Sequence, residues 1–404
     1  MTLKAVLLIL DGLGDFQYRK LGVKTPLEAA RAKNLNLMAK TGETGFMFSI
    51  APGVIPGSDT AHLSIFGYSP KKYYFGRGLY EALGAGVELK EQDIAFRANL
   101  ATIENNVLVD RRAGRKSDFL KSLFEELNGI SVEDVTIIAK HSSEHRGVVV
   151  LRGPGLSDKI SDVDPHKVGV PISYCHPLDD SEEAKKTARI INHLMHSANE
   201  ILERSKNNAL RKDHGLLPAN ALLLRGAAKY HTAEPIYEKT KAKFSCVAGG
   251  ALYKGVAKFV GMDVVDVPGA TGDKFTNLRA KLEAAIKAKE NSDVVFLHIK
   301  ATDSFGHDGD YVGKKQFIEK VDREIISGLM KNFDVIVVTG DHSTPCKRKE
   351  HSGDAVPLLI WGENCRADKG TFSETNPSPT LFIRGEDLIN IILNKIELLK
   401  KYGE

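Results

Sequence analysis

Short runs of consecutive apolar residues recur along most of this chain and alternate with longer amphipathic segments. The runs occupy residues 5–10, 244–247, 262–267, 294–299, 335–338 and 356–361. Unbroken apolar runs of this length are typical of strands that are buried on both faces of a parallel sheet. Amphipathic helices are expected at 273–289, 313–331 and 387–401. The pattern predicts an α/β fold, a mostly parallel sheet with helices on both faces.

Residues 73–212 interrupt this pattern. Their expected elements are two strands of alternating polarity and a long amphipathic helix, at 96–103, 145–152 and 180–206. Alternation is typical of strands that have only one face in a core. The sequence therefore predicts an inserted α+β domain at 73–212, in a core formed by 1–72 and 213–404. The core pattern resumes with a strand expected at 221–224.

Two helix starts can be located from their capping residues. Thr25 and Glu28 have the spacing of a capping box, which predicts a helix over 26–40. A second helix is expected to start at Ser58 or Asp59, whose side chain would cap it. A hydroxyl at a helix N-terminus also faces free N–H groups, which favour a bound anion.

Composition is that of an ordinary globular protein. The 404 residues are 42% hydrophobic and 27% charged, with a formal net charge of +4. So small a charge argues against nucleic acid as a partner, and the basic residues are expected to serve a small anionic ligand. The four cysteines form no Cys-x-x-Cys pair, which favours a reducing, cytoplasmic location. We expect no signal peptide and no membrane partner, and the oligomeric state stays open.

Carboxylates follow three of the expected strands. Asp11 comes directly after the run at 5–10, and Asp303 and Asp341 follow the runs at 294–299 and 335–338. In α/β sheets the carboxyl ends of the strands form the edge at which ligands bind. Acids gathered there are expected to converge on a cation.

Three histidines extend this set. His342 is adjacent to Asp341, His307 lies four residues after Asp303, and His351 follows in the same segment as His342. Taken alone, Asp303 with His307 is typical of a solvated helix start, Asp341 with His342 is a weak signal, and His351 is typical of a surface or hydrogen-bonded histidine. Together they indicate metal ligands. Oxygen and imidazole donors without thiolate favour divalent manganese, magnesium, cobalt or zinc, and two such ions form the usual clamp for phosphoryl chemistry. Ser58 is the candidate nucleophile, with a plain helix cap as the alternative.

The motifs that contain these residues resemble one family. They are Asp11-Gly, Gly-Ser58-Asp-Thr-Ala-His-Leu-Ser-Ile, Asp303-x-x-Gly-His307, Gly-Asp341-His342-Ser-Thr-Pro and Glu-His351-Ser-Gly-Asp. The chain resembles cofactor-independent (2,3-bisphosphoglycerate-independent) phosphoglycerate mutases of the archaeal type, which belong to the alkaline phosphatase superfamily. The resemblance covers both core segments in order and is much weaker over 73–212. It implies an alkaline phosphatase-like, metal-binding phosphotransferase core and an inserted substrate-binding cap.

The resemblance also implies roles for individual residues. One metal ion would be held by Asp303, His307 and His351, and the other by Asp11, Ser58, Asp341 and His342. Ser58 would carry the phosphoryl group as a covalent intermediate. Lys239, in a Glu-Lys pair before the strand that ends in Gly249-Gly250, matches a catalytic lysine of the family. Gly57 is a departure, since the longer branch of the family has asparagine there.

Cap residues are predicted less sharply. The substrate-binding candidates are His145, Arg146, Arg111, Arg112 and Arg115. Any one of them alone fits a solvated strand edge equally well. Asp162 and Asp164 are candidates for the acid and base that move protons between two hydroxyls. A closing cap would exclude water while the phosphoserine exists.

The predicted activity is the interconversion of 3-phosphoglycerate and 2-phosphoglycerate in glycolysis and gluconeogenesis, with two divalent ions, manganese first. The alternatives are a metal-dependent phosphatase, phosphodiesterase or phosphopentomutase with the same core. A catalytically inactive binding protein is the third class, and the complete ligand set argues against it. Product analysis with 3-phosphoglycerate separates these possibilities.

Overall fold

The computed structural model describes residues 2–399 and 401, and the chain forms two compact units. Unit 1 comprises Met1–Tyr74 and Ala233–Glu404, and unit 2 comprises Phe75–Thr232, which lies between them in sequence. Of the helices in the described part of the chain, none has the length and apolar character needed to cross a membrane.

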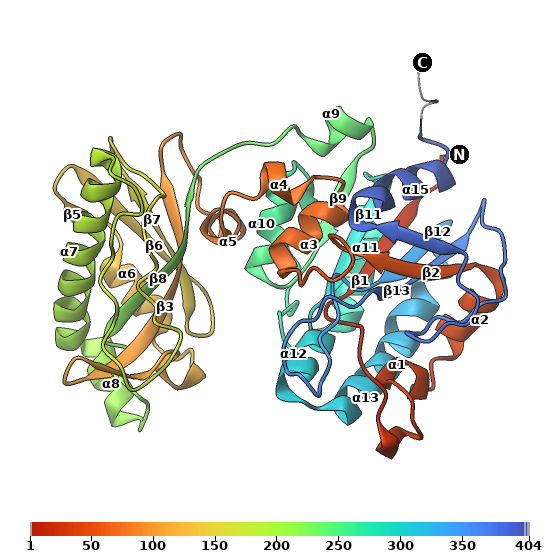
Figure 1. Ribbon diagram of the computed structural model, residues 1–404, viewed down its shortest axis with the longest axis horizontal. Helices are drawn as coiled ribbons and strands as arrows, with labels where there is room; N and C mark the ends of the chain where they lie inside the picture. Colours follow the sequence, from red (N-terminus) through yellow and green to blue (C-terminus); the bar gives the residue numbers. More distant parts are fainter. Residues whose placement is uncertain (1, 400, 402–404) are drawn as a thin grey trace. The chain divides into compact units, whose positions relative to one another are not determined.

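Unit 1 is built on an eight-stranded sheet (Figure 1). Its strands are β1 (Ala5–Leu10), β2 (Glu43–Phe48), β9 (Phe244–Val247), β10 (Asp263–Val264), β11 (Val294–Ile299), β12 (Val335–Thr339), β13 (Val356–Gly362) and β14 (Leu381–Arg384). Their order is β10-β9-β11-β1-β12-β13-β2-β14. The first five strands in that order are parallel, and only β13 runs antiparallel to its neighbours. The expected mostly parallel sheet is therefore present.

Helices cover both faces of this sheet. One face packs against α1 (Pro26–Ala29), α2 (Lys33–Thr41), α11 (Leu278–Ala288) and α13 (Tyr311–Val321), which continues through a π-helical turn (Asp322–Ile326) into α14 (Ser327–Leu329). On the other face lie α3 (Ser58–Ile65), α10 (Ala251–Phe259) and α15 (Leu388–Lys395). Short helices α4 (Pro70–Tyr73), α9 (Ile236–Thr240) and α12 (Ala301–Asp308) complete the unit. The helix expected at 387–401 is shorter, and residue 400 lies outside the described residues.

The expected helix over 26–40 is divided in two. The Thr25–Glu28 capping box is present, but α1 ends at Ala29 and α2 begins at Lys33. The carboxylate of Asp322 accepts hydrogen bonds from the backbone N–H groups of Asn34 (3.2 Å) and Leu35 (2.8 Å). A carboxylate from a distant helix thus caps α2, which local sequence does not reveal.

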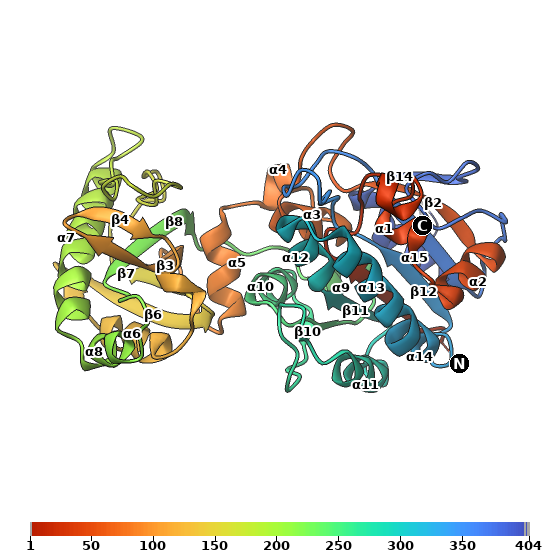
Figure 2. The ribbon, with the colours of Figure 1, turned by 90° about the horizontal axis from the view of Figure 1, so that it is seen from below.

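Unit 2 contains an antiparallel sheet of six strands (Figures 1 and 2). These are β3 (Ile94–Glu104), β4 (Val107–Asp110), β5 (Ser131–Val132), β6 (Val135–Ser143), β7 (Arg146–Arg152) and β8 (Ala221–Lys229). Helices α5 (Arg77–Gly84), α6 (Leu120–Leu127), α7 (Glu182–Arg204) and α8 (Lys206–Asp213) belong to the same unit. Both views show α7 running along this sheet, and its apolar residues share a core with β3, β6 and β7.

One strand belongs to a different sheet from the one expected. The strand expected at 221–224 in the core sheet is β8, and it pairs antiparallel with β3 from Lys229 to Ala221. Unit 2 consequently ends at Thr232 rather than at 212. The apolar run Ala221–Leu224 has the composition of a buried strand in either sheet, so periodicity alone does not decide its partner.

Candidate functional site

Three adjacent strands bring the predicted carboxylates of unit 1 together. In the sheet β1 lies between β11 and β12, parallel to both, so the three carboxyl ends share one edge. Asp11 follows β1, Asp303 lies on α12 after β11, and Asp341 follows β12. All three side chains are buried, with at most 2% exposure. They are called the carboxylate cluster below.

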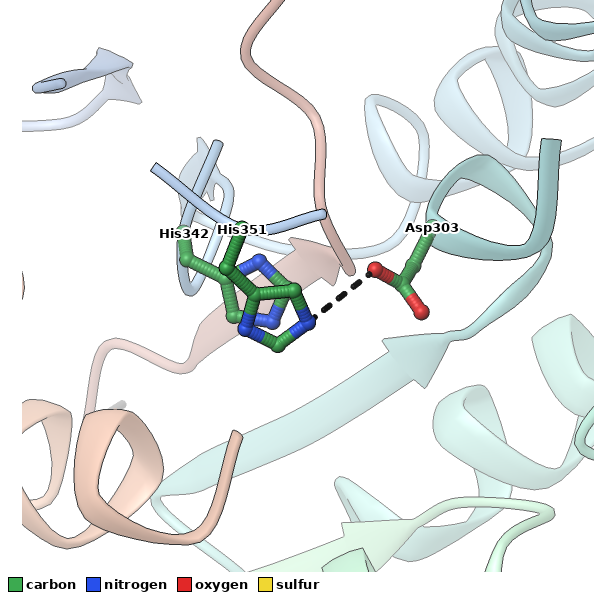
Figure 3. Close-up of side chains that lie close together, drawn as sticks. All are labelled: Asp303, His342 and His351. Atoms are coloured by element: carbon green, nitrogen blue, oxygen red, sulfur yellow. Dashed lines mark ion pairs between the residues drawn. The ribbon is translucent and has the colours of Figure 1, made fainter. Parts of the chain in front are cut away.

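The histidines join this cluster in two overlapping groups. Donor atoms of Asp303, His342 and His351 lie within 4.8 Å of one another, as do those of Asp11, Asp341 and His342. Figure 3 shows the rings of His342 and His351 stacked on each other near the Asp303 carboxylate. His351 Nε2 lies 3.6 Å from Asp303 Oδ1. Because His342 belongs to both groups, the two candidate ion positions adjoin.

His307 lies at the border of this arrangement. Its Nε2 is 3.4 Å from Asp303 Oδ1, and its ring centroid is 5.3 Å from that of His351. Its Nδ1 contacts the carbonyl oxygen of Lys349 at 2.8 Å, which leaves Nε2 toward the carboxylate. The histidine predicted at the i+4 position of Asp303 therefore shares its helix face, as the spacing indicates.

Ser58 opens α3 within the same site. Its side chain is buried at 5% exposure, and its Oγ lies 3.2 Å from His342 Nε2. The expectation that Ser58 or Asp59 caps this helix is wrong, because Gly57 is the N-cap residue and the Thr60 hydroxyl accepts from its N–H at 3.1 Å. The Ser58 hydroxyl is thus free of the capping role that was the main alternative to a nucleophile.

Several supporting residues escaped the sequence prediction. The Thr344 hydroxyl donates to Asp303 Oδ1 at 2.7 Å, and His298 Nε2 lies 3.0 Å from Asp11 Oδ2. Lys300 Nζ lies 2.5 Å from Asp303 Oδ2 and 3.3 Å from Asp11 Oδ1. His298 and Lys300 had a signal, since each is a polar residue in or directly after an otherwise apolar run.

The glycine after Asp11 lets these elements approach. Gly12 has φ +62°, and a Cβ there would lie 2.5 Å from Thr344 Oγ1 and 2.8 Å from the Asp303 backbone. Its N–H donates to Asp341 Oδ1 at 3.0 Å. Only glycine combines this conformation with so close a contact.

The charges in the site respond to burial and to one another. Burial and the neighbouring Asp11 raise the pKa of Asp341 well above its usual value. Burial opposes ionisation of Asp11 and Asp303 too, but the ammonium of Lys300 together with the neighbouring histidines lowers the pKa of both carboxyls. Burial, followed by His351, lowers the pKa of His342 to about 3. His342 is therefore neutral near pH 7, the form in which imidazole binds metals.

The donor set fits divalent cations. Its atoms are carboxylate oxygens, imidazole nitrogens and one hydroxyl, without thiolate. Within the described residues, Asp341 Oδ2 is a buried oxygen that accepts no hydrogen bond. Among those residues, Lys300 is also the only lysine or arginine that pairs with the carboxylate cluster. A buried excess of negative charge is costly unless cations join it.

Lys239, a residue of α9, contacts the chain beyond the opposite end of α3 from Ser58. Its ammonium donates to the carbonyl of Gly67 and lies 4.4 Å from the ring centroid of Tyr68, just after the C-terminal end of the helix. The pKa of Lys239 is lowered, mainly by burial. A cation at a helix C-terminus is favourable in itself, so these contacts have a structural explanation, and its catalytic role stays a prediction.

Unit 2 carries its own buried polar group, on one face of its sheet. Phe96 and Ala98 of β3 point into the apolar core, so Arg97 and Asn99 point to the opposite face. In register, Arg97 lies opposite Arg225 of β8, and Asn99 lies opposite Arg146 of β7. These four residues, Arg97, Asn99, Arg146 and Arg225, are called the arginine face below.

Positive charge is in excess on the arginine face. Glu81 of α5 lies 3.6 Å from Arg97 Nη1 and 3.1 Å from Arg77 Nε, and Glu144 lies 3.9 Å from Arg146 Nη2. Burial, followed by Arg77, lowers the pKa of Arg97 and of Arg225. Among the described residues, buried nitrogens without a hydrogen-bond partner include the Nε atoms of Arg97, Arg146 and Arg225 and Nδ1 of His145. Like charges directly opposite each other in a sheet are destabilising, so this face has the charge to attract an anion.

The predicted cap residues divide into two sets around this face. Arg146 belongs to it, and His145 directly precedes β7 at 2% exposure. Arg111 is instead paired with Asp164, through Nε at 2.8 Å and Nη2 at 2.6 Å. The pKa of Asp164 is lowered, because hydrogen bonds from Arg111 and from the His166 N–H outweigh burial. Asp164 is therefore ionised and paired, which argues against it as the acid, while Asp162 accepts from the Gly226 N–H at 2.8 Å.

Fold and site together define a class: an α/β protein with a candidate binuclear metal site and a buried serine hydroxyl at the carboxyl edge of a parallel sheet. A family model described as 2,3-bisphosphoglycerate-independent phosphoglycerate mutase matches residues 39–208. An Archaeoglobus fulgidus protein of that name, numbered 1, is 47% identical over 98% of this chain and 99% of its own length. One from Methanococcus aeolicus is 45% identical over 99% and 100%. The chain belongs to the family of 2,3-bisphosphoglycerate-independent phosphoglycerate mutases.

Solved structures agree over the full length. A Pyrococcus horikoshii protein superposes with a TM-score of 0.85 at 36% identity, covering 100% of both chains. A cofactor-independent phosphoglycerate mutase from Thermoplasma acidophilum superposes with a TM-score of 0.69 at 35% identity, covering 97% of this chain and 99% of that one. The likeness thus extends over both units.

Proposed function

We propose that this enzyme interconverts 3-phosphoglycerate and 2-phosphoglycerate through a phosphoryl group held on Ser58, with two divalent ions in unit 1. The observation that carries the proposal is the position of Ser58 Oγ, 3.2 Å from His342, a residue shared by both ligand groups. Membership of the mutase family supports the reaction, and the relatives named above give no support to a phosphatase, phosphodiesterase or phosphopentomutase.

Seven residues would hold the ions. Asp303, His307 and His351 would bind one, and Asp11, Ser58, Asp341 and His342 the other, with manganese as the first candidate metal. When bound, such ions favour ionisation of a hydroxyl and offset charge on phosphoryl oxygens. The shared position of His342 supports two adjoining ions rather than one.

Ser58 would carry the group transfer. Its Oγ gives up the hydroxyl proton and attacks phosphorus, the bond from phosphorus to the C3 oxygen breaks, and the C3 oxygen takes up a proton. The C2 hydroxyl then loses its proton and attacks the same phosphorus, which releases Ser58. Because Ser58 is the first residue of α3, the N-terminal end of the helix would favour the phosphoryl oxygens, with the Thr60 N–H already donating to Asp59 Oδ1 at 3.0 Å. Lys239 stays the predicted further cation.

The arginine face of unit 2 would bind the anionic groups of the substrate. Its buried guanidinium nitrogens without partners have the geometry for charge-assisted bonds to carboxylate or phosphate. His145, Arg112 and Arg115 are the further candidates, and Arg111 is assigned to the Asp164 pair. We also place the reaction in the cytoplasm, consistent with the free thiols of Cys175, Cys246, Cys346 and Cys365.

The test follows both products and the intermediate. Purified protein with manganese and 3-phosphoglycerate is expected to yield 2-phosphoglycerate, with little inorganic phosphate, by phosphorus NMR. Rapid acid quench followed by peptide mass spectrometry should find one phosphoryl group on Ser58. Release of glycerate and phosphate in equal amounts would make the protein a hydrolase. A phosphoryl group on Thr60 would reassign the nucleophile.

A further inference from the structure

Unit 2 contains a fully buried arginine. Among the described residues, all of its side-chain hydrogen bonds go to backbone carbonyl oxygens. Arg211 of α8 is 0% exposed. Its guanidinium donates to the carbonyls of Leu217 (2.9 Å), Lys116 (3.2 Å), Asp118 and Ala113 (2.9 Å). No ion pair within the described residues involves Arg211. Burying a charged guanidinium without an ion pair is costly, so the backbone segment that Arg211 binds is expected to have a role.

Three of the four carbonyls belong to a backbone segment of unusual conformation. Ala113, Gly114, Arg115 and Phe119 have φ values of +44°, +70°, +58° and +63°. Three of these residues carry side chains, for which the left-handed region is unfavourable. Asp110 supports the segment from its other side, accepting from the N–H groups of Arg112 (2.6 Å) and Gly114 (3.2 Å). Residues 110–119 are called the pinned loop below.

Strained backbone of this kind persists only where surrounding contacts impose it, and it clusters at functional sites. The turn Ala113–Arg115 of the pinned loop packs against β3, the strand that carries Arg97 and Asn99. Arg115 lies close enough to His145 to contribute to its lowered pKa, after burial and the nearer Arg146 and Arg97. The strained turn therefore brings Arg115 to the strand that carries two residues of the arginine face.

We propose that Arg211 is a positioning residue for substrate binding: it fixes the pinned loop in the left-handed conformation that presents Arg115 to the arginine face. The inference rests on the proposed role of unit 2 in binding substrate. A positioning role for Arg211 has one consequence that a purely structural role does not have. Arg211 acts through Arg115, so its loss should matter for binding only while Arg115 is present.

A double-mutant cycle tests that consequence. The variants are Arg211→Lys, Arg115→Ala and the double variant, each assayed as manganese-loaded, full-length enzyme for its Michaelis constant, KM, with the substrate 3-phosphoglycerate. Lysine keeps the charge but cannot spread its donors over four carbonyls. We expect each single change to raise KM about tenfold, with kcat changed less, and the double variant to match Arg115→Ala. Multiplicative effects would overturn the proposal.

Two further measurements separate positioning from loss of fold. Leu151→Ala, in the same apolar core on β7, is the matched destabilised control, and it should lower the melting temperature without raising KM. Amide exchange at residues 113–119 should accelerate in Arg211→Lys but not in Leu151→Ala. If Arg211→Lys does not fold, Asp110→Ala replaces it, since it loosens the pinned loop from the other side.

The outcomes also distinguish this inference from the proposed function. Equal rises of KM in Arg211→Lys and Leu151→Ala would reduce Arg211 to general support and overturn the positioning role. An unchanged KM in Arg115→Ala, with normal KM in Arg146→Ala as well, would instead refute substrate binding by unit 2. An unchanged KM in Arg115→Ala alone would refute the route through Arg115 and leave the arginine face standing.

Discussion

The two units carry opposite excesses of charge, buried in unit 1 and partly buried in unit 2. In unit 1 the carboxylate cluster has one ammonium partner in the described residues, that of Lys300. Among the described residues of unit 2, the arginine face is paired with two carboxylates, those of Glu81 through Arg97 and of Glu144 through Arg146. Each unit thus keeps a charge imbalance that folding alone would select against, because buried charge is costly without a partner.

The difference indicates what each unit is for. The carboxylate cluster and its imidazoles offer donors to divalent cations, whereas the arginine face offers N–H groups to anions. Under the proposed function, metal ions would balance the carboxylate cluster and an anionic substrate would balance the arginine face. On this view unit 1 performs group transfer and unit 2 retains the substrate, and the following experiments test whether the two roles can be separated.

The largest effect is expected at Ser58. Ser58→Ala should lower mutase turnover by about four orders of magnitude or more, because the nucleophile is lost. Since Ser58 makes no capping bond, the free energy of unfolding should change by less than about 1 kcal/mol. Thr60→Ala, in the same helical turn, is the matched control and should stay active. Substantial turnover in Ser58→Ala would remove the chemistry from this residue.

Metal content should follow unit 1 alone. Protein loaded with manganese and desalted should contain about two ions per chain, as two-metal sites do. Asp341→Asn removes a ligand from one group and should reduce this to about one, measured by elemental analysis. Arg225→Gln, on the arginine face, should leave the count unchanged. One ion per chain in active parent enzyme would contradict the two-metal proposal.

The same contrast explains what sequence could predict. Asp11, Asp303 and Asp341 were found because each follows an apolar run, and parallel strands bring their carboxyl ends together without knowledge of register. The arginine face depends on antiparallel register, which places Arg97 opposite Arg225. No local pattern contains that pairing, and β8 was expected in the other sheet. Likewise, the gap between α1 and α2 depends on Asp322, far along the chain.

Retention of substrate should depend on unit 2. Arg146→Ala removes a guanidinium from the arginine face, and a charge-assisted hydrogen bond contributes about 1.5–3 kcal/mol. The ratio of 2-phosphoglycerate formed to phosphate released should therefore fall about 10- to 100-fold. Turnover of p-nitrophenyl phosphate should change much less, because unit 1 is intact. Arg189→Ala, which breaks an exposed pair with Glu133 in the same unit, is the control and should keep the parent ratio.

Acid should destabilise unit 2 through His145. Burial, then Arg146, lowers its pKa to about 3, whereas an unfolded histidine titrates near 6.5. The unfolded state therefore binds the extra proton between these values, and stability is lost as pH falls below 6.5. From pH 6.5 to 5.0 the loss is about 2 kcal/mol. In His145→Gln, the number of protons taken up on unfolding, obtained from the slope of the unfolding free energy against pH, should fall by about one near pH 5. An unchanged slope would mean that His145 is already protonated in the folded protein.

The smallest effect concerns Lys300, which among the described residues is the one lysine or arginine that pairs with the carboxylate cluster. Its ammonium contacts Asp303 and Asp11, so it competes with a divalent ion for the same oxygens and also repels it. Two unit charges about 4 Å apart in water repel by about 1 kcal/mol, and a divalent ion by more. Against this, Lys300 orients the carboxylates. Other donors remain to do so, the Thr344 hydroxyl on Asp303 and His298 on Asp11.

Repulsion should therefore outweigh orientation in Lys300→Met. Calorimetric titration of stripped protein should show manganese binding about fivefold tighter than in the parent, which corresponds to about 1 kcal/mol. The metal-free variant should also melt at a lower temperature, because its carboxylates have lost their ammonium. Lys395→Met breaks a buried pair with Glu43 elsewhere in unit 1 and should leave the affinity unchanged. Weaker manganese binding in Lys300→Met, with normal binding in Lys395→Met, would contradict this prediction. It would show that Lys300 helps metal binding by orienting the carboxylates and does not compete with the ion.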